Sequence, residues 1–240
     1  MINKRVMIKR IVASIPNTIT LLNLLSGAVA CILSFHSSTQ IGSLTGCQWA
    51  FIFIGMAAVF DFCDGASARL LHAYSPVGKE LDSLADLVSF GLAPSLLLYN
   101  AISAAEGTTD LLCLPALVSL FIAAMGALRL ARFNVDDRQT TEFIGLPIPA
   151  NALFWIGYIA WMNSHAYPGL WVSLIFIVAL GLMMVSPLHM FSLKFKNFAF
   201  KENYLRYLLI ASAVLMVIWL GVPGFAWTIV IYILMSVVNR

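Results

Sequence analysis

The sequence predicts an all-α polytopic membrane protein, built as a bundle of about eight transmembrane helices. Of its 240 residues, 61% are hydrophobic and only 10% are charged, whereas soluble domains are about 25% charged. The mean hydropathy is +0.91. Apolar runs long enough to cross a bilayer core of about 30 Å recur along the chain, separated by Gly, Pro, Ser or charged residues. An ordinary soluble domain is therefore excluded.

Charge and cysteine usage narrow the classes further. The net charge is only +3, and the basic residues stand in short groups beside apolar runs, which argues against a nucleic-acid-binding protein. Cys31, Cys47, Cys63 and Cys113 show no CxxC or Cys/His spacing, so we expect neither a disulfide framework nor a zinc site. The first apolar run, residues 15–35, is too long for a cleaved signal peptide.

Eight apolar segments are expected to span the membrane. They occupy residues 16–36, 46–73, 79–103, 112–133, 148–163, 168–187, 205–220 and 223–238. The last two are only about 16 residues long, so a re-entrant hairpin over 205–238 is an alternative. No linker or repeat divides the chain, and we expect a single membrane domain over residues 1–240.

In an eight-span arrangement, all 14 Lys and Arg residues fall on the same side of the membrane. The connectors at 37–45, 104–111, 164–167 and 221–222 carry none. Because cytoplasmic segments are enriched in Lys and Arg, we expect both termini to be cytoplasmic. Residues 1–14 carry four of these cations between spaced apolar residues, which indicates an interfacial amphipathic helix on the anionic leaflet. A disordered basic segment is the alternative.

Four aspartates lie inside expected transmembrane segments, where a charged side chain costs about 2.5–3.5 kcal/mol and usually marks function. Asp61 and Asp64 are near the end of one segment, and Asp82 and Asp86 are near the start of the next. A helical rise of about 1.5 Å per residue brings both pairs to the same depth, just inside the cytoplasmic interface. Four such carboxylates repel one another unless cations bind, and oxygen ligands without His or Cys favour Mg²⁺ or Mn²⁺. We therefore predict a site for two divalent cations.

Small residues accompany these acids. At about 100° per residue, each helix presents its acids and small residues on one face. The residues on these faces are Asp61, Asp64, Gly65 and Ala68 on the first helix, and Gly78, Asp82 and Asp86 on the second. Small residues admit a bulky ligand, and Arg69 suits phosphate oxygens. The site thus indicates chemistry on a phosphate ester or anhydride. The alternatives are an acid network paired with Arg69 and Lys79, and a cation-transport pathway.

The same residues resemble the signature of the CDP-alcohol phosphatidyltransferase family. From Asp61 to Asp86 the chain reads D-x2-D-G-x2-A-R-x8-G-x3-D-x3-D, with no departure at a fixed position. Shorter matches resemble the branch of the family that transfers to serine, and they lie at 16–20, 89–94, 129–134, 145–149 and 186–187. The resemblance covers residues 16–200, and the segments at 205–238 add nothing diagnostic.

The resemblance implies a reaction and its site residues. A phosphatidyl group would pass from CDP-diacylglycerol to the hydroxyl of L-serine, with glycerol 3-phosphate or an inositol phosphate as alternative acceptors. Asp61, Asp64, Asp82 and Asp86 would bind two divalent cations, Mg²⁺ or Mn²⁺, and Asp86 would also be the general base. The residues implied in the CDP-lipid pocket are Asn17, Thr20, Gly65, Ala68, Arg69 and Gly78.

The remaining expectations concern the residues that bind the acceptor, the oligomeric state and the cellular location. Ser89, Arg129 and Arg132 are candidates for binding the acceptor, with anchoring by the positive-inside rule as the alternative role of the two arginines. The resemblance also implies a homodimer. The expected location is a bacterial cytoplasmic membrane, with the active site on the cytoplasmic side.

Labelling tests the expected topology. Asn3→Cys and Asn239→Cys, each in a chain lacking the native cysteines, should react with a membrane-impermeant thiol reagent only from the cytoplasmic side of sealed vesicles. Labelling of the two positions from opposite sides would mean an odd number of spans.

Overall fold

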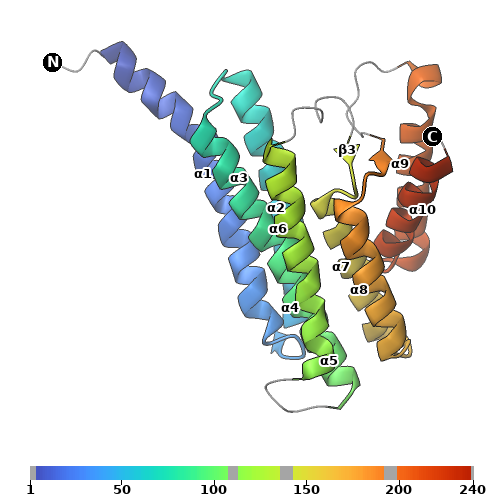
Figure 1. Cartoon of the computed structure of the whole chain (residues 1–240). Coiled ribbons are helices and arrows are strands. Elements are labelled where there is room, and N and C mark those ends of the chain that lie inside the picture. The colour runs from blue at the N-terminus through green and yellow to red at the C-terminus, as the bar shows by residue number, and fades with distance from the viewer. Residues whose placement is uncertain (1–3, 108–112, 136–142, 192–198, 239–240) are drawn as a thin grey trace. The chain divides into compact units, whose positions relative to one another are not determined.

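The structure, a computed structural model, describes residues 4–107, 113–135, 143–191 and 199–238. Helices dominate these ranges (Figure 1). In chain order the elements are α1 (Lys4–Ser34), β1 (Gln40–Ile41), β2 (Leu44–Thr45), α2 (Gly46–Leu70), α3 (Pro76–Asp86), the π-helix η1 (Leu87–Leu92), α4 (Ala93–Ala105), α5 (Leu114–Leu117), the 3₁₀-helix η2 (Val118–Leu120), α6 (Phe121–Val135), β3 (Phe143–Ile144), α7 (Ile148–Ser164), α8 (Leu170–Val185), β4 (His189–Met190), α9 (Phe200–Leu220) and α10 (Gly224–Val238). The chain forms two compact units, Met1–Leu97 and Leu98–Arg240, which are described separately.

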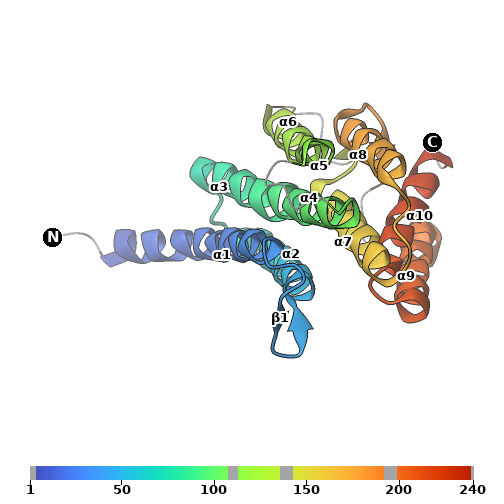
Figure 2. The same cartoon turned by 90° about the horizontal axis from the view of Figure 1, so that it is seen from below.

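Helices α1, α2 and α3, the π-helix η1 and the first residues of α4 build the first unit. α1 packs along α2 and α3 and also contacts η1 (Figures 1 and 2). The short antiparallel β1–β2 hairpin links α1 to α2, with Gln40 opposite Thr45. Thr45 then caps α2 in a capping box: the Gln48 N–H donates to the Thr45 hydroxyl, and the Thr45 N–H donates to the Gln48 side chain. The entry into the helix that carries Asp61 and Asp64 is thereby fixed by local hydrogen bonds.

A tight turn separates α2 from α3. His72 adopts a left-handed conformation with φ of 50°, and the Ala73 N–H donates to the Ala68 carbonyl at 3.0 Å. Ser75 caps α3 by accepting a hydrogen bond from the Gly78 N–H at 2.9 Å, with Pro76 in the first turn, where no N–H is required. The turn reverses the chain, and it brings the carboxylates of Asp61 and Asp64 on α2 close to that of Asp82 on α3.

The π-helix η1 follows Asp86 directly, and its Ser89 lies against α1. The Ser89 hydroxyl donates to the Asn23 carbonyl at 3.0 Å. A Cβ on Gly27 would stand 2.3 Å from Ser89 Oγ and 2.6 Å from Ser89 Cα. Only glycine permits this approach between the backbones of α1 and η1. Single π-helical turns inside longer helices are rare and frequently occur at functional sites.

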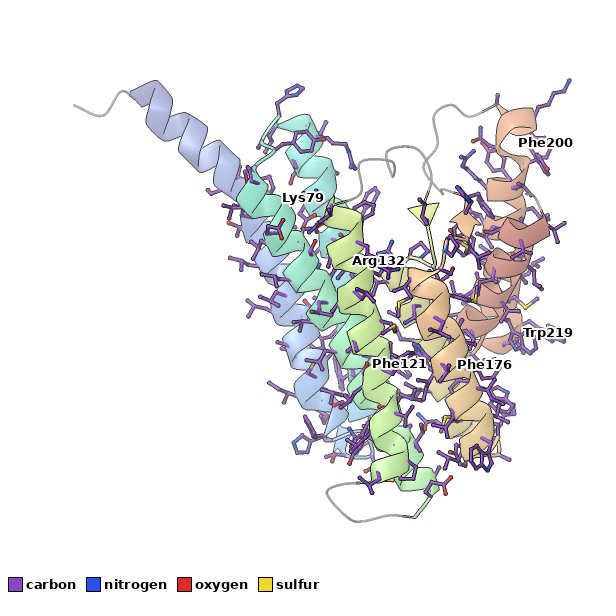
Figure 3. All side chains as sticks on the ribbon, in the orientation of Figure 1. Lys79, Phe121, Arg132, Phe176, Phe200 and Trp219 are labelled. Carbon is purple, nitrogen blue, oxygen red and sulfur yellow. The ribbon has the colours of Figure 1, made fainter. Side chains whose placement is uncertain are left out.

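In the second unit, α6 packs on α8, and α10 packs on both α7 and α9. Gly181 leaves room for Phe121 of α6, because a Cβ there would lie 2.7 Å from the Phe121 ring. Figure 3 labels Phe121 on α6, with Phe176 on α8, and it shows Phe200 and Trp219 at opposite ends of α9. The antiparallel β3–β4 pair joins Ile144 to His189.

Five helical stretches of the described chain are long and apolar enough to cross a membrane. They are Ser14–Ser34, Gly46–Leu70, Pro76–Ala105, Leu114–Val135 and Asn203–Leu220. α8 and α10 are apolar but shorter. A helical, polytopic membrane protein is therefore supported, whereas the count of eight spans stays a prediction.

Two boundaries differ from those expected by more than three residues. α1 continues through Pro16 without a break near residue 15, so the expected interfacial segment and the first span form one helix; residues 1–3 lie outside the described chain. The surface position of this segment stays a prediction. α9 has 21 residues rather than about 16, because the helix also includes residues 200–204, ahead of the expected apolar run.

A glycine pair tests the contact between α1 and η1. Gly27→Ala should lower the melting temperature of the detergent-solubilised protein, since forcing apart the α1 and η1 backbones costs about 1–3 kcal/mol. Gly55→Ala in α2 is the control because its Cβ would meet nothing within 4 Å. It should be neutral or stabilising. Equal melting temperatures for the two variants would contradict this packing.

Candidate metal and nucleotide site

Three of the four predicted acids converge in the first unit. Asp61 and Asp64 come from the end of α2, and Asp82 comes from α3. One carboxylate oxygen from each lies within 4.8 Å of the others. We call these three residues the acid cluster. Such spacing lets one cation contact oxygens of all three side chains.

The acid cluster fits a divalent cation. Asp64 Oδ2 and Asp82 Oδ1 are buried, and neither oxygen has a hydrogen-bond partner among the described residues. Asp64 is only 5% exposed. A buried carboxylate oxygen without a partner is costly, and a bound cation removes that cost. Three oxygen ligands without His or Cys suit Mg²⁺ or Mn²⁺.

Asp86 is placed differently from the acid cluster. It is the last residue of α3, is 8% exposed, and its Oδ1 accepts a hydrogen bond from Asn23 Nδ2 at 3.2 Å. The carboxyl does not belong to the group within 4.8 Å, although the charges of all three clustered acids act on it. Asp86 therefore lies beside the acid cluster, and a hydrogen bond from Asn23 of α1 holds its carboxylate.

A pocket of about 200 Å³ adjoins the acid cluster. α1, α2, α3 and the turn before α3 all contribute to its walls. The lining residues are Pro16, Asn17, Thr20, Asp64, Gly65, Ala68, Ala73, Tyr74, Ser75, Gly78, Lys79 and Asp82. The structure thus brings together, around two of the acids, every residue expected for the CDP-lipid except Arg69.

Gly78 shows why a small residue is needed in the pocket wall. A Cβ on Gly78 would lie 2.9 Å from Asn17 Oδ1, so only glycine lets α1 and α3 approach here without displacing that amide. Arg69 lies outside the pocket lining, but its Nη1 would be 3.6 Å from a Cβ on Gly65. Its guanidinium therefore stands next to the pocket wall.

Five lining residues were not predicted: Pro16, Ala73, Tyr74, Ser75 and Lys79. Lys79 projects from the N-terminal part of α3 (Figure 3). The Ser75-Pro76 pair signals a helix start in the sequence, and it could have marked the turn as a wall of the site.

The three acceptor candidates occupy different surroundings. Ser89 is fully buried in the first unit, where its hydroxyl donates to Asn23. Arg132 of α6, in the second unit, donates from Nη1 to the Val185 carbonyl at 2.9 Å and so caps the end of α8. Arg129 of the same helix is 7% exposed, with its guanidinium 5.8 Å from the Phe133 ring centre. Their predicted contacts with the acceptor stay predictions.

Comparison with known proteins identifies the family. Residues 13–185, which include the whole acid motif, match the CDP-alcohol phosphatidyltransferase family. This chain belongs to the CDP-alcohol phosphatidyltransferase family. The family consists of phosphotransferases, so the transport and purely structural interpretations of the acids are set aside.

Several family members resemble the chain closely. A CDP-diacylglycerol–serine O-phosphatidyltransferase of Methanocaldococcus jannaschii is 33% identical over 218 residues, covering 90% of this chain and 89% of the relative. A protein of the same name from Bacillus subtilis is 39% identical over 135 residues, covering 56% of this chain and 69% of the relative. An archaetidylserine synthase of Methanothermobacter thermautotrophicus is 37% identical over 145 residues, covering 58% and 55%.

Metal binding tests the acid cluster. Asp64→Asn and Asp82→Asn should each weaken Mn²⁺ binding, measured by electron paramagnetic resonance, at least tenfold, since even outer-sphere changes cost about 10–100-fold. Glu80→Gln is the matched control because it removes a carboxylate from α3 outside the acid cluster, and it should bind Mn²⁺ like the wild type. Unchanged binding by both Asp variants would contradict the site.

Proposed function

We propose that this protein transfers a phosphatidyl group from CDP-diacylglycerol to the hydroxyl of L-serine, producing phosphatidylserine and CMP. The observation that carries the choice of serine is the likeness to the M. jannaschii serine transferase over 90% of this chain. The complete motif and the convergence of its acids support the donor side of the reaction.

Two divalent cations, Mg²⁺ or Mn²⁺, are proposed to be held by Asp61, Asp64, Asp82 and Asp86. When bound, they supply positive charge that neutralises the pyrophosphate and the departing CMP. The carboxylates position that charge on the cytoplasmic half of α2 and α3, at the depth where a lipid head group meets water.

The pocket is proposed to hold the cytidine and phosphates of the CDP-lipid. Asn17 and Thr20 line it from α1. Gly65, Ala68 and Gly78 line it with small or absent side chains, which leave space for the ligand. The N-terminus of α3 and Lys79 face the same pocket, and both favour an anion. Arg69 stands beside the wall, where it can reach phosphate oxygens.

Asp86 is proposed to act as the general base. The serine hydroxyl attacks the phosphorus that bears diacylglycerol, a new P–O bond forms, and the P–O bond to CMP breaks. Asp86 takes the hydroxyl proton as attack proceeds, because an alkyl hydroxyl is a poor nucleophile at neutral pH. The products are phosphatidylserine and CMP, so each phosphate group is accounted for.

Arg129 and Arg132 are proposed to bind the serine carboxylate, with Ser89 near the acceptor. Burial suits Arg129 to a desolvated ion pair with a carboxylate. The hydrogen bond to Val185 gives Arg132 a structural task as well.

The proposed location is a bacterial cytoplasmic membrane, with the site and both termini facing the cytosol. The proposed assembly is a homodimer, which light scattering of the detergent-solubilised protein would measure. A monomer mass under active conditions would contradict it.

An acceptor assay tests the proposed function. Purified protein in mixed micelles with CDP-diacylglycerol, Mn²⁺ and labelled serine should release CMP and form labelled phosphatidylserine in equal amounts. Glycerol 3-phosphate and inositol phosphate are supplied in parallel reactions. CMP release that requires one of these two acceptors, and not serine, would contradict the proposal.

Asp86→Asn separates the proposed base from the metal ligands. An amide cannot take the hydroxyl proton, and general-base assistance contributes about 10²–10⁴-fold, so kcat should fall by at least 10² while CDP-diacylglycerol binding persists. Added Mn²⁺ should not restore turnover, whereas it should partly restore Asp61→Asn. A kcat above about a tenth of wild type at saturating Mn²⁺ would show that another group accepts the proton.

Arg129→Ala tests the acceptor site. Loss of a cation that pairs with the serine carboxylate should raise the KM for serine at least tenfold and leave the KM for CDP-diacylglycerol unchanged. Arg132→Ala should show the same KM change together with a lower melting temperature, because it removes the cap on α8. Equal changes in the KM of both substrates would indicate phosphate binding instead.

A further inference from the structure

Asn23 has a polar side chain in a fully buried position, where a polar group without hydrogen-bond partners destabilises the fold. It lies in the middle of the Ser14–Ser34 stretch and is fully buried. Its Nδ2 donates to Asp86, while its Oδ1 is buried with no hydrogen-bond partner among the described residues. An apolar residue of similar size would avoid this cost. Stability alone therefore does not explain an amide here.

Asn23 makes hydrogen bonds to a residue on each side of the junction between α3 and η1. The side chain of Asn23 binds Asp86, the last residue of α3, and its carbonyl accepts the Ser89 hydroxyl of η1. One turn further along α1, Gly27 lets the two backbones meet. Asp86 is thereby fixed to α1 as well as to its own helix.

The hydrogen bond sets Asp86 apart from the acid cluster. Asp64 and Asp82 each keep a buried oxygen without a hydrogen bond, as expected of metal ligands, whereas Asp86 Oδ1 is bound to an amide. A neutral amide N–H orients a carboxylate without cancelling its charge, unlike Lys or Arg. The amide nitrogen must face Asp86, because the amide oxygen would repel the carboxylate.

We propose that Asn23 is a positioning residue that acts through Asp86. Its N–H fixes Oδ1, so that Oδ2 is directed to the hydroxyl of the acceptor alcohol. This inference rests on the proposed function, in which Asp86 receives the hydroxyl proton. Orientation matters because a misplacement of about 1 Å can cost about 10²-fold in rate.

Three variants and a control test the role. Asn23→Leu removes the donor and the unpartnered oxygen while keeping a branched side chain, so it should lower kcat at least tenfold at a temperature where the melting curve shows the variant fully folded. Asn23→Ala and Asn23→Ser form a matched pair, in which the serine hydroxyl can still donate through a water molecule. Asn23→Ser should therefore retain more of kcat than Asn23→Ala. Ser26→Ala changes another buried polar residue of α1 and should leave kcat unchanged.

Two readouts separate positioning from a structural role. The KM for CDP-diacylglycerol should stay within about threefold of wild type in every Asn23 variant, because Asn23 does not line the pocket. The loss of kcat should persist at saturating Mn²⁺, which excludes weaker metal binding as its cause. Wild-type kcat in Asn23→Leu or Asn23→Ala would overturn the inference. The inference would also be overturned if kcat fell in proportion to the melting temperature across the variants, or if Asn23→Ser and Asn23→Ala had equal kcat values.

The acceptor assay of the wild-type protein tests the proposed function independently of the Asn23 variants. If wild-type protein uses another acceptor instead of serine, the choice of serine fails, and the Asn23 variants are then assayed with that acceptor. A tenfold lower kcat with the acceptor that the wild type uses supports the role of Asn23, and an unchanged kcat overturns it.

Discussion

Repulsion between carboxylates held close together among α1, α2 and α3 is the constraint on which the rest of this site depends. Asp61, Asp64 and Asp82 place oxygens within 4.8 Å of one another, and two of those carboxyls have a buried oxygen without a hydrogen bond. In surroundings of low dielectric, such an arrangement needs positive charge. Acids held this close fit bound cations, which in the proposed function hold the phosphates of the CDP-lipid.

The helices are shaped to maintain this closeness. The Ser75 cap and the left-handed His72 reverse the chain within a few residues, which brings the ends of α2 and α3 together. α1 supplies the third wall, and it approaches closely because Gly78 and Gly27 carry no side chain. At Gly27 a larger side chain would meet the Ser89 backbone and separate α1 from η1, whereas at Gly78 it would displace the side chains of Asn17 and Ser75.

Much of the site was predictable, because helical periodicity decides which residues share a face. The sequence predicted that four acids share one site; the structure brings Asp61, Asp64 and Asp82 together and leaves the Asp86 carboxyl outside their group. The hydrogen bond from Asn23 to Asp86 was not, because it joins residues 63 apart in sequence. The π-helix η1 was missed for a similar reason: one wider turn leaves no mark on hydropathy, and it depends on packing against α1.

Anomalous diffraction from crystals grown with Mn²⁺ and CDP-diacylglycerol tests the central claim most directly. The account predicts two Mn²⁺ peaks at the acid cluster, each in contact with carboxylate oxygens of Asp61, Asp64, Asp82 or Asp86 and beside the pyrophosphate of the lipid. Bound nucleotide with no Mn²⁺ peak beside these residues, or Mn²⁺ peaks only at other positions, would contradict it.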